Sequence, residues 1–246
     1  MQIGIDLGAT KIESVLLDSE GSELHRSRKE SPQNYKDTIA SITESVNLIE
    51  KKFKKNFNVG VCHPGSTNFD SGLIQNANNS PWLNNMNFTD DISKNLNRKV
   101  FCENDANCFS LSESYDGAAK HYKVVFGIIL GSGCGGGLVV DNKILVGPNA
   151  FAGEWGHVPI PNSENNYTIE DHVSGKGLEK LYFKKYKEKL VAKDIFLKSR
   201  RNSSKEKAFV KDFLDKLGLS LSVLINIVDP DAIVFGGGVS KEIESL

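Results

Sequence analysis

The sequence has little of what a nucleic-acid-binding or membrane protein needs. Its 246 residues include 30 Lys and Arg against 31 Asp and Glu, a formal net charge of -1, so it lacks the basic excess expected of a nucleic-acid or anionic membrane surface. No apolar run approaches the roughly 20 residues that a membrane-spanning helix needs. These absences favour a small-molecule ligand over nucleic acid or membrane.

Cysteine is also scarce, and a secretion signal is lacking. The four cysteines are Cys62, Cys102, Cys108 and Cys134. They form no C-x-x-C pair and lie in or beside apolar stretches, as reduced core thiols do. The segment Met1 to Asp6 has no basic stretch followed by an apolar one, which a signal peptide requires. We therefore expect reduced thiols and a cytoplasmic protein.

Alternating apolar residues and a helical periodicity indicate an α/β fold. Two alternating segments, Gln2–Leu7 and Ile12–Leu17, precede a more polar third segment, Glu23–Arg28, which predicts a meander of strands. From Lys36 to Phe53 the apolar residues recur at spacings of three and four. This spacing predicts a helix with one side packed on a sheet.

One segment of the chain is repeated. Ile3–Thr10 aligns without a gap with Phe126–Gly133, and both copies read as strand, Gly-rich turn, strand. The strand that ends at Gly65 follows the first long helix. In the same way, a strand that ends at Gly236 follows a second amphipathic helix from about Glu206 to Val228.

This repeat predicts two similar α/β lobes. We place the first lobe at residues 1–118 and the second at 119–246, with a hinge near residues 112–124. If a ligand binds between the lobes, we expect them to close around it.

The two Gly-rich turns predict a phosphate clamp. The first turn carries Asp6, Thr10 and Lys11, whereas the second has Ile129 in place of Asp6 and consists almost entirely of Gly and Ser. Two such turns can direct backbone N–H groups at a polyphosphate. The alternative is a pair of tight β-turns, because Gly reaches positive φ most readily.

Five motifs follow one another along the chain. They are Asp6 to Lys11, Asn104 to Asn107, Leu130 to Gly137, Gly153 to His157, and Asp229-Pro230-Asp231 with Gly236 to Gly238. In this order they resemble the ROK family of bacterial sugar kinases, within the actin, hexokinase and Hsp70 ATPase superfamily. The resemblance implies an α/β protein with two similar lobes of the actin-like ATPase (ribonuclease H-like) fold and a cleft between them. It also implies ATP and Mg²⁺ as cofactors, a hexose as substrate and a possible homodimer.

Two groups of the family look closest. Asn76-Ala77-Asn78 followed by Trp82-Leu83-Asn84 resembles the fructokinases. The segment Cys108 to Glu113 and the region of Asp229-Pro230-Asp231 suit either these or the N-acetylglucosamine kinases. The resemblance therefore implies an ATP-dependent hexose kinase, fructokinase-like, with N-acetylglucosamine kinase as the alternative. Two other classes are an inactive sugar-binding protein and a transcriptional repressor. We do not expect a repressor, because the first strand starts at Ile3 and leaves no room for a DNA-binding domain before it.

The resemblance implies a role for each motif residue. Asp105 is the expected base, which takes the proton of the sugar hydroxyl, although an Asp that caps the following helix is an alternative. Asp6 is expected to hold Mg²⁺, through water. The implied sugar-binding residues are Gly65, Asn78, Asn104, Glu154, His157 and Glu170. The implied ATP-binding residues are Gly8, Thr10, Lys11, Gly131, Ser132, Gly133, Gly236, Gly237 and Gly238.

The sequence departs from the family at two places. Most relatives carry C-x-C-G-x-x-G-C, whose cysteines bind a structural zinc, but the stretch Pro161–Thr168 has no cysteine here, and His157 and His172 cannot supply four ligands. We therefore expect no zinc and a more mobile loop. The family also continues beyond its Gly-rich adenosine turn, whereas this sequence ends at Leu246. We expect the C-terminal part of the family fold to be missing, with apolar surface uncovered.

Overall fold

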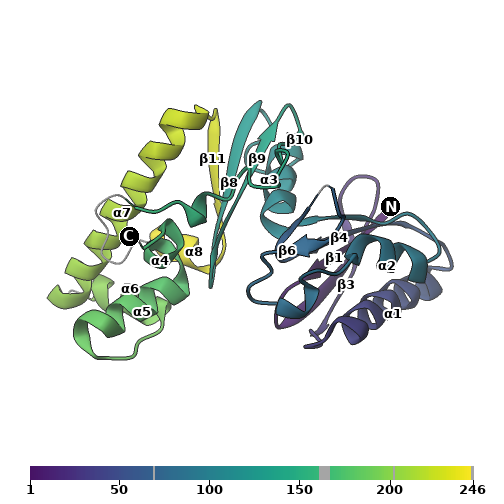
Figure 1. The fold of residues 1–246 in the computed structure, drawn as a ribbon, viewed down its shortest axis with the longest axis horizontal. Coiled ribbons are helices and arrows are strands. Elements are labelled where there is room, and N and C mark those ends of the chain that lie inside the picture. Colours follow the sequence, from purple (N-terminus) through teal and green to yellow (C-terminus); the bar gives the residue numbers. More distant parts are fainter. Residues whose placement is uncertain (69, 161–166, 202, 245–246) are drawn as a thin grey trace. The chain divides into compact units, whose positions relative to one another are not determined.

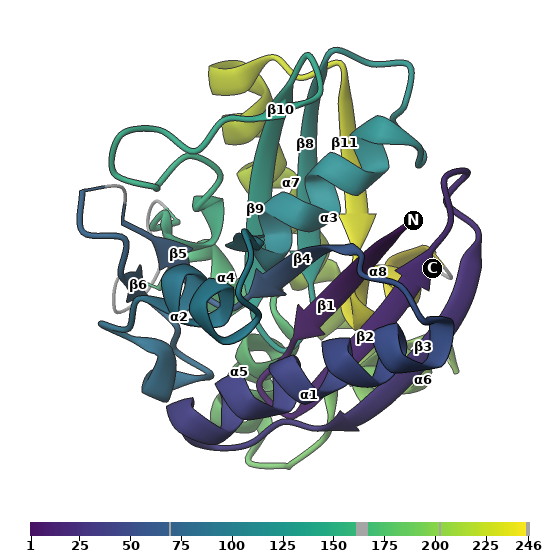
Figure 2. The same cartoon turned by 90° about the vertical axis from the view of Figure 1, so that its right-hand side faces the viewer.

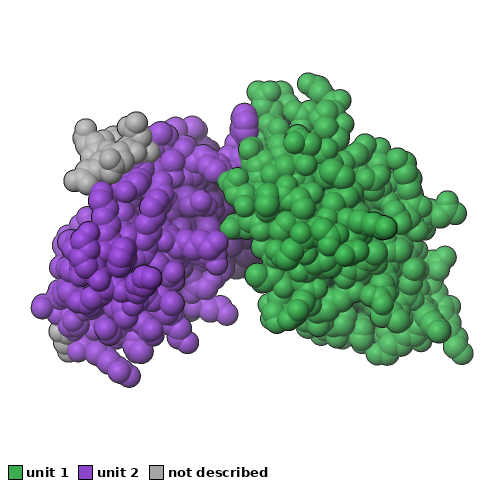
Figure 3. Space-filling view, turned by 60° about the horizontal axis from the view of Figure 1, so that its bottom comes forward, with its two compact units in different colours: residues 1–108, 148–150 green, residues 109–147, 151–246 purple. Residues whose placement is uncertain are grey.

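The computed structural model describes residues 1–68, 70–160, 167–201 and 203–244, and it divides into two compact units (Figures 1 and 3). Unit 1 comprises residues 1–108 and 148–150, and unit 2 comprises residues 109–147 and 151–246. The boundary falls after Cys108, within helix α3 (Asp105–Tyr115). A division into lobes after residue 118 stays a prediction.

Unit 1 is built on a five-stranded sheet with the order β3-β2-β1-β4-β7. Its strands are β1 (Gln2–Leu7), β2 (Lys11–Leu17), β3 (Glu23–Glu30), β4 (Asn58–His63) and β7 (Phe101–Asn104). Strand β1 runs antiparallel to β2 and parallel to β4, and β4 runs parallel to β7. The predicted meander is thus present. A small hairpin pairs β5 (Ser66–Thr67) with β6 (Ile74–Gln75).

The helices of unit 1 complete its core. They are α1 (Tyr35–Phe53), α2 (Phe88–Asn95), the 3-10 turn η1 (Pro81–Leu83) and the first turn of α3. Helix α1 runs across the sheet (Figure 2) and begins after Asn34, whose side chain accepts a hydrogen bond from the Asp37 N–H at 2.9 Å. The predicted apolar side of α1 is buried against residues of β1, β2 and β4.

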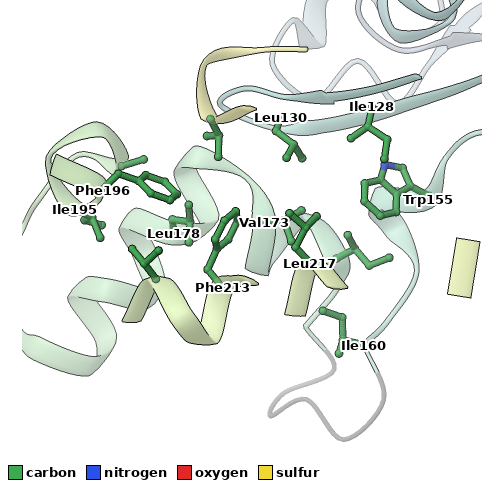
Figure 4. Packing of buried hydrophobic residues seen from close by; sticks show 14 of the residues in the cluster. Ile128, Leu130, Trp155, Ile160, Val173, Leu178, Ile195, Phe196, Phe213 and Leu217 are labelled. Atoms are coloured by element: carbon green, nitrogen blue, oxygen red, sulfur yellow. The ribbon is translucent and has the colours of Figure 1, made fainter. Parts of the chain in front are cut away.

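Unit 2 is built on a four-stranded sheet with the order β10-β9-β8-β11. Its strands are β8 (Val124–Leu130), β9 (Cys134–Val140), β10 (Lys143–Ile144) and β11 (Ala232–Gly236). Its helices are η2 (Trp155–His157), α4 (Ile169–Val173), α5 (Gly175–Tyr186), α6 (Ala192–Arg200), α7 (Ser204–Val228) and α8 (Gly238–Glu244). The main core packs Leu130 of β8 with Val173, Leu178, Phe196 and Phe213 of the helices (Figure 4).

The two sheets repeat one topology. In each sheet the first strand pairs antiparallel with the second and parallel with a strand that follows a long helix. Strand β2 at 11–17 and strand β9 at 134–140 are separated by 123 residues at both ends. The repeat predicted from the sequence is therefore present in the fold.

Helix α7 buries one side and exposes apolar side chains on the other. Phe213 and Leu217 are buried, whereas Leu219, Val223 and Ile227 are 42%, 37% and 78% exposed. Despite the 25-residue length of α7, no helix among the described residues is apolar enough over a sufficient length to span a bilayer.

Candidate active site

Three parallel strands of unit 1 end at one edge of its sheet. The register pairs Asp6 of β1 with Cys62 of β4, and His63 of β4 with Asn104 of β7. Since the carboxyl ends of parallel strands meet at the same edge, the sheet gathers Asp6, the turn at Gly65 and the Asn104 segment there. Asp6 and Asn104, nearly a hundred positions apart in the sequence, thus lie at the same edge of the sheet.

Asn104 anchors the start of α3. Its Oδ1 accepts hydrogen bonds from the N–H groups of Ala106 at 2.9 Å and Asn107 at 3.2 Å, and its Nδ2 donates to the Gly65 carbonyl at 2.9 Å. Asp105 is exposed, and its Oδ1 also accepts from the Ala106 N–H at 2.9 Å. The cap weighed as the alternative role of Asp105 is therefore shared with Asn104, and Asn104 has a structural role that the sequence analysis missed.

Gly65 lies directly against the segment that leads to Asn78. Its φ is +80°, and a Cβ there would lie 2.5 Å from the Gln75 carbonyl oxygen and 2.9 Å from the Ala77 nitrogen. No residue with a side chain fits both conditions. The fold thus brings Gly65 next to the backbone one residue before Asn78, which is exposed.

Asp6 lies just before the first Gly-rich turn. The Cys62 thiol donates a hydrogen bond to Asp6 Oδ1 at 3.3 Å. A hydrogen bond with Cys108, together with burial and the nearby Asp6, raises the pKa of the Cys62 thiol far above its usual value, which keeps it a donor. The Gly8 N–H donates to the Lys11 carbonyl at 2.9 Å and closes the turn. An exposed carboxylate in this place can serve as a ligand for Mg²⁺, directly or through a bound water.

The carbonyl groups of this first turn are occupied. The Ser31 N–H donates to the Thr10 carbonyl at 3.0 Å, and Gln33 Nε2 donates to the Ala9 carbonyl at 2.9 Å. Within the described residues, the N–H groups of Ala9 and Thr10 have no hydrogen-bond acceptor. The turn therefore has N–H groups available for a ligand, while its carbonyls at Ala9 and Thr10 are already hydrogen-bonded, as an anion site requires.

The second turn, between β8 and β9, has the same arrangement. The N–H groups of Gly175 and Lys176, at the start of α5, donate to the carbonyls of Gly131 at 2.8 Å and Ser132 at 3.1 Å. In the described part of the chain, the N–H groups of Ser132 and Gly133 find no acceptor. Both predicted phosphate turns thus present free N–H groups.

Glu170 contacts this second turn. Its Oε2 accepts a hydrogen bond from the Cys134 N–H at 2.7 Å, and a Cβ on Gly133 would lie 2.9 Å from the same oxygen. The family resemblance implied only a sugar-binding role for Glu170. No local pattern signals this contact, because it joins residues 36 positions apart.

Glu154 and His157 lie at the two ends of η2. Glu154 Oε2 is 3.4 Å from His157 Nε2, and His157 is exposed. Burial raises the pKa of the Glu154 carboxyl; the nearby His157 opposes this shift and Glu170 adds to it. The Ile169 N–H donates to the Val158 carbonyl at 2.9 Å, so the end of η2 lies beside the start of α4, which carries Glu170.

Glycines of β9 make room for this segment. A Cβ on Gly136 would lie 2.6 Å from the Gly153 carbonyl oxygen and 2.6 Å from Trp155 Cδ1. A Cβ on Gly156 would lie 2.6 Å from the Cys134 carbonyl oxygen. The Gly-rich run after the second turn therefore serves close packing as well as the turn itself.

A cavity of about 620 Å³ in unit 2 borders the second turn. Its lining consists of Gly131, Ser132, Gly175, Lys176, Glu179, Val191, Ala192, Lys193, Gly238, Val239 and Glu242. It joins the second turn to the predicted adenosine turn at Gly238. Lys176 and Lys193 add cationic side chains that the sequence analysis missed, because helix starts far apart in the sequence bring them there.

The three glycines of the adenosine turn have different surroundings. Gly237 has a φ of +89°, and a Cβ there would lie 2.4 Å from the Leu130 carbonyl oxygen. A Cβ on Gly236 would lie 2.7 Å from the Phe109 ring, whereas Gly238 faces open space. Gly236 and Gly237 thus allow close packing, and Gly238 is the one of the three that lines the cavity.

The predicted loss of the zinc site concerns a stretch that lies largely outside the described residues, since the structure describes nothing from 161 to 166. His172, one of the two histidines considered, lies edge-on to Tyr167 with 5.8 Å between ring centres. The absence of zinc and the mobility of this loop stay predictions.

Solved structures define the class of the fold. The ROK hexokinase of Thermus thermophilus superimposes with a TM-score of 0.87 at 25% identity, over 100% of this chain and 86% of that one. A ROK glucokinase of Streptomyces griseus, solved with glucose and AMPPNP, gives a TM-score of 0.80 at 25% identity, over 98% and 84% of the two chains. The protein therefore has the α/β fold of the actin-like ATPases, as the family resemblance implied.

The family follows from the sequence comparisons. The ROK family model matches residues 2–246. The N-acetyl-D-glucosamine kinase of Pectobacterium atrosepticum is 35% identical over 258 residues, which covers 98% of this chain and 84% of the relative. The chain belongs to the ROK family, and it is an ATP-dependent sugar kinase.

Proposed function

We propose that this protein transfers the γ-phosphoryl group of ATP to a hydroxyl of N-acetylglucosamine. The observation that carries the proposal is the 35% identity, over nearly the whole chain, to a relative named for that activity. Of the two sugars considered from the sequence, fructose has the weaker support. The fructokinase-like segment near Asn78 is outweighed by the sequence as a whole.

Asp105 is the proposed base. A sugar hydroxyl is a weak nucleophile near neutral pH, so a carboxylate that takes its proton assists the attack on the γ-phosphorus. The new bond joins the sugar oxygen to this phosphorus, the bond to the β,γ-bridging oxygen breaks, and ADP leaves. The exposed carboxylate at the start of α3, fixed by the Asn104 cap, supports this role.

The two Gly-rich turns are the proposed phosphate sites. The free N–H groups of Ala9, Thr10, Ser132 and Gly133 are suited to phosphate oxygens, and the exposed Lys11 adds a positive charge. Mg²⁺, when bound, neutralises charge on the phosphates, and Asp6 is the proposed residue that holds it through water. The cavity beside Gly238 is the proposed place of the adenosine.

The proposed sugar-binding residues are five polar side chains and one glycine. Glu154, His157 and Glu170 belong to unit 2, and Gly65, Asn78 and Asn104 belong to unit 1. Such groups satisfy ring hydroxyls, and a site built for them discriminates against sugars that lack a partner.

A coupled ADP-release assay with glucose, fructose, mannose, N-acetylglucosamine and N-acetylmannosamine tests the proposal. We expect the highest kcat/KM with N-acetylglucosamine. A higher value with fructose would restore the fructokinase interpretation. Binding of the sugars without ADP release would instead support an inactive sugar-binding protein. Light scattering of the same sample tests the predicted homodimer.

A further inference from the structure

The position of Glu170 is fixed before any ligand binds. It lies in the first turn of α4, where the Thr168 N–H donates to Asp171 Oδ2 at 3.0 Å in a capping box. The Ile169 N–H donates to the Val158 carbonyl at 2.9 Å. These bonds fix the backbone next to Glu170, which limits the positions that its carboxylate can take.

One oxygen of this carboxylate accepts a hydrogen bond from the second turn. Glu170 Oε2 accepts from the Cys134 N–H at 2.7 Å, a length typical of a charge-assisted hydrogen bond. The absence of a side chain on Gly133 lets the oxygen approach, since a Cβ would lie 2.9 Å from it. The contact fastens the turn at the residue where β9 begins.

The same turn is fastened on its other side by α5. The N–H groups of Gly175 and Lys176 hold the carbonyls of Gly131 and Ser132. Between these two attachments lie the N–H groups of Ser132 and Gly133, which are free for phosphate oxygens. A change in the position of Glu170 therefore acts directly on the proposed phosphate site.

We infer that Glu170 is a positioning residue that links sugar binding to the nucleotide-binding turn: its one carboxylate serves the sugar and holds the Cys134 N–H. The inference rests on the proposed sugar site, and it adds a role for Glu170 toward ATP. A sugar hydroxyl bound by this carboxylate restricts its motion and so stabilises the turn before ATP arrives. By linkage, ATP bound at the turn strengthens sugar binding to the same degree.

The decisive experiment measures the affinity of the full chain for a non-hydrolysable ATP analogue, by calorimetry, without sugar. For Glu170→Ala we expect affinity weaker by about 10-fold, because a charge-assisted hydrogen bond to the turn is lost. Glu170→Gln keeps an oxygen that accepts from Cys134, so we expect its analogue affinity to stay within about 3-fold of wild type while sugar affinity falls. Glu188→Ala, which changes an exposed glutamate of the same unit, is the matched control.

Wild-type affinity for the analogue in Glu170→Ala would overturn the inference and leave a sugar role only. This result is independent of the sugar assay, since it needs no phosphorylation. A second measurement avoids variants altogether, in case Glu170→Ala does not fold. Hydrogen exchange at the Cys134 N–H of the wild type is expected to slow when saturating N-acetylglucosamine is added, and unchanged exchange would contradict the linkage.

Discussion

The turn between β1 and β2 and the turn between β8 and β9 share a backbone design and differ in their surroundings. In both, neighbouring donors occupy two carbonyls, and two N–H groups have no acceptor in the part of the chain that the structure describes. The first turn follows Asp6 and carries Lys11, whereas the second has Ile129 at the equivalent place and is held by Glu170 from another helix. A repeated scaffold can thus offer backbone N–H groups in both copies while only the first copy carries the carboxylate proposed to hold Mg²⁺.

The largest expected effect on kcat comes from replacing Asp105, the proposed base of unit 1. Asp105→Asn preserves size but removes the proton acceptor, so we expect kcat to fall by about 10²- to 10⁴-fold with little change in sugar affinity. Single-turnover phosphorylation measures the chemical step, and calorimetry with the sugar measures binding. A rate within about threefold of wild type, far below the range for a positioned base, would show that Asp105 is not the base.

The next largest effect concerns the Mg²⁺ concentration that the enzyme needs, and it compares equivalent residues at the two turns. Asp6→Asn should raise the Mg²⁺ concentration for half-maximal activity by about 10- to 100-fold, the usual cost of losing an outer-sphere partner. Ile129→Val, at the equivalent place in the second turn, should leave that concentration unchanged. Titration of the ADP-release rate with Mg²⁺ makes the comparison, and equal curves for Asp6→Asn and wild type would remove Asp6 from the metal site.

A pair of glycines tests the two units separately. Gly65→Ala and Gly237→Ala each force a Cβ into backbone at positive φ, at 2.5 Å and 2.4 Å. We expect each to cost about 1 to 3 kcal/mol of unfolding free energy. The first should mainly raise the sugar KM, and the second the ATP KM.

Gly72→Ala is the control for this pair. Gly72 also has a positive φ of +69°, but a Cβ there would lie 3.7 Å from its nearest neighbour. Urea unfolding and initial-rate kinetics provide the measurements. If the two glycine variants raised both KM values equally, the assignment of sugar binding to the turn at Gly65 and of nucleotide binding to the turn shaped by Gly237 would be untenable.

The smallest effect concerns Glu154. Its pKa is raised mainly by burial, so the folded state holds the proton more tightly than the unfolded state. Stability from this group is therefore present at low pH and is lost as the pH rises from the unfolded pKa through the folded one. We expect Glu154→Gln to be slightly more stable than wild type at pH 7 and not at pH 4. Thermal unfolding at both values tests the sign.

Local patterns in the sequence predicted the central strands of both units and the two long helices. The periodicity of Ile39, Ile42, Val46 and Ile49 predicted the long helix of unit 1, and all four residues are buried. The aligned repeat predicted both strand–turn–strand units. These features depend on neighbours within a few residues or on a copied segment, so the sequence displays them directly.

Contacts between distant segments could not be predicted in this way. Three contacts depend on how helices pack on the sheets. They are the hydrogen bond from Cys134 to Glu170, the cap that Asn104 provides while it is bonded to Gly65, and the position of Lys193 in the lining of the cavity beside the second turn. The family resemblance supplied roles for Glu170 and Asn104 but not these contacts. These contacts depend on tertiary packing, which the spacing of residues along the chain does not reveal.

The measurement that tests the comparison of the two turns most directly is residue-resolved hydrogen exchange with a non-hydrolysable ATP analogue and Mg²⁺. If both turns bind the polyphosphate, exchange should slow at the N–H groups of Ala9 and Thr10 and equally at those of Ser132 and Gly133, since none of the four has an acceptor among the described residues. Protection at only one pair, or at neither, would contradict the claim that both copies of the turn bind phosphate.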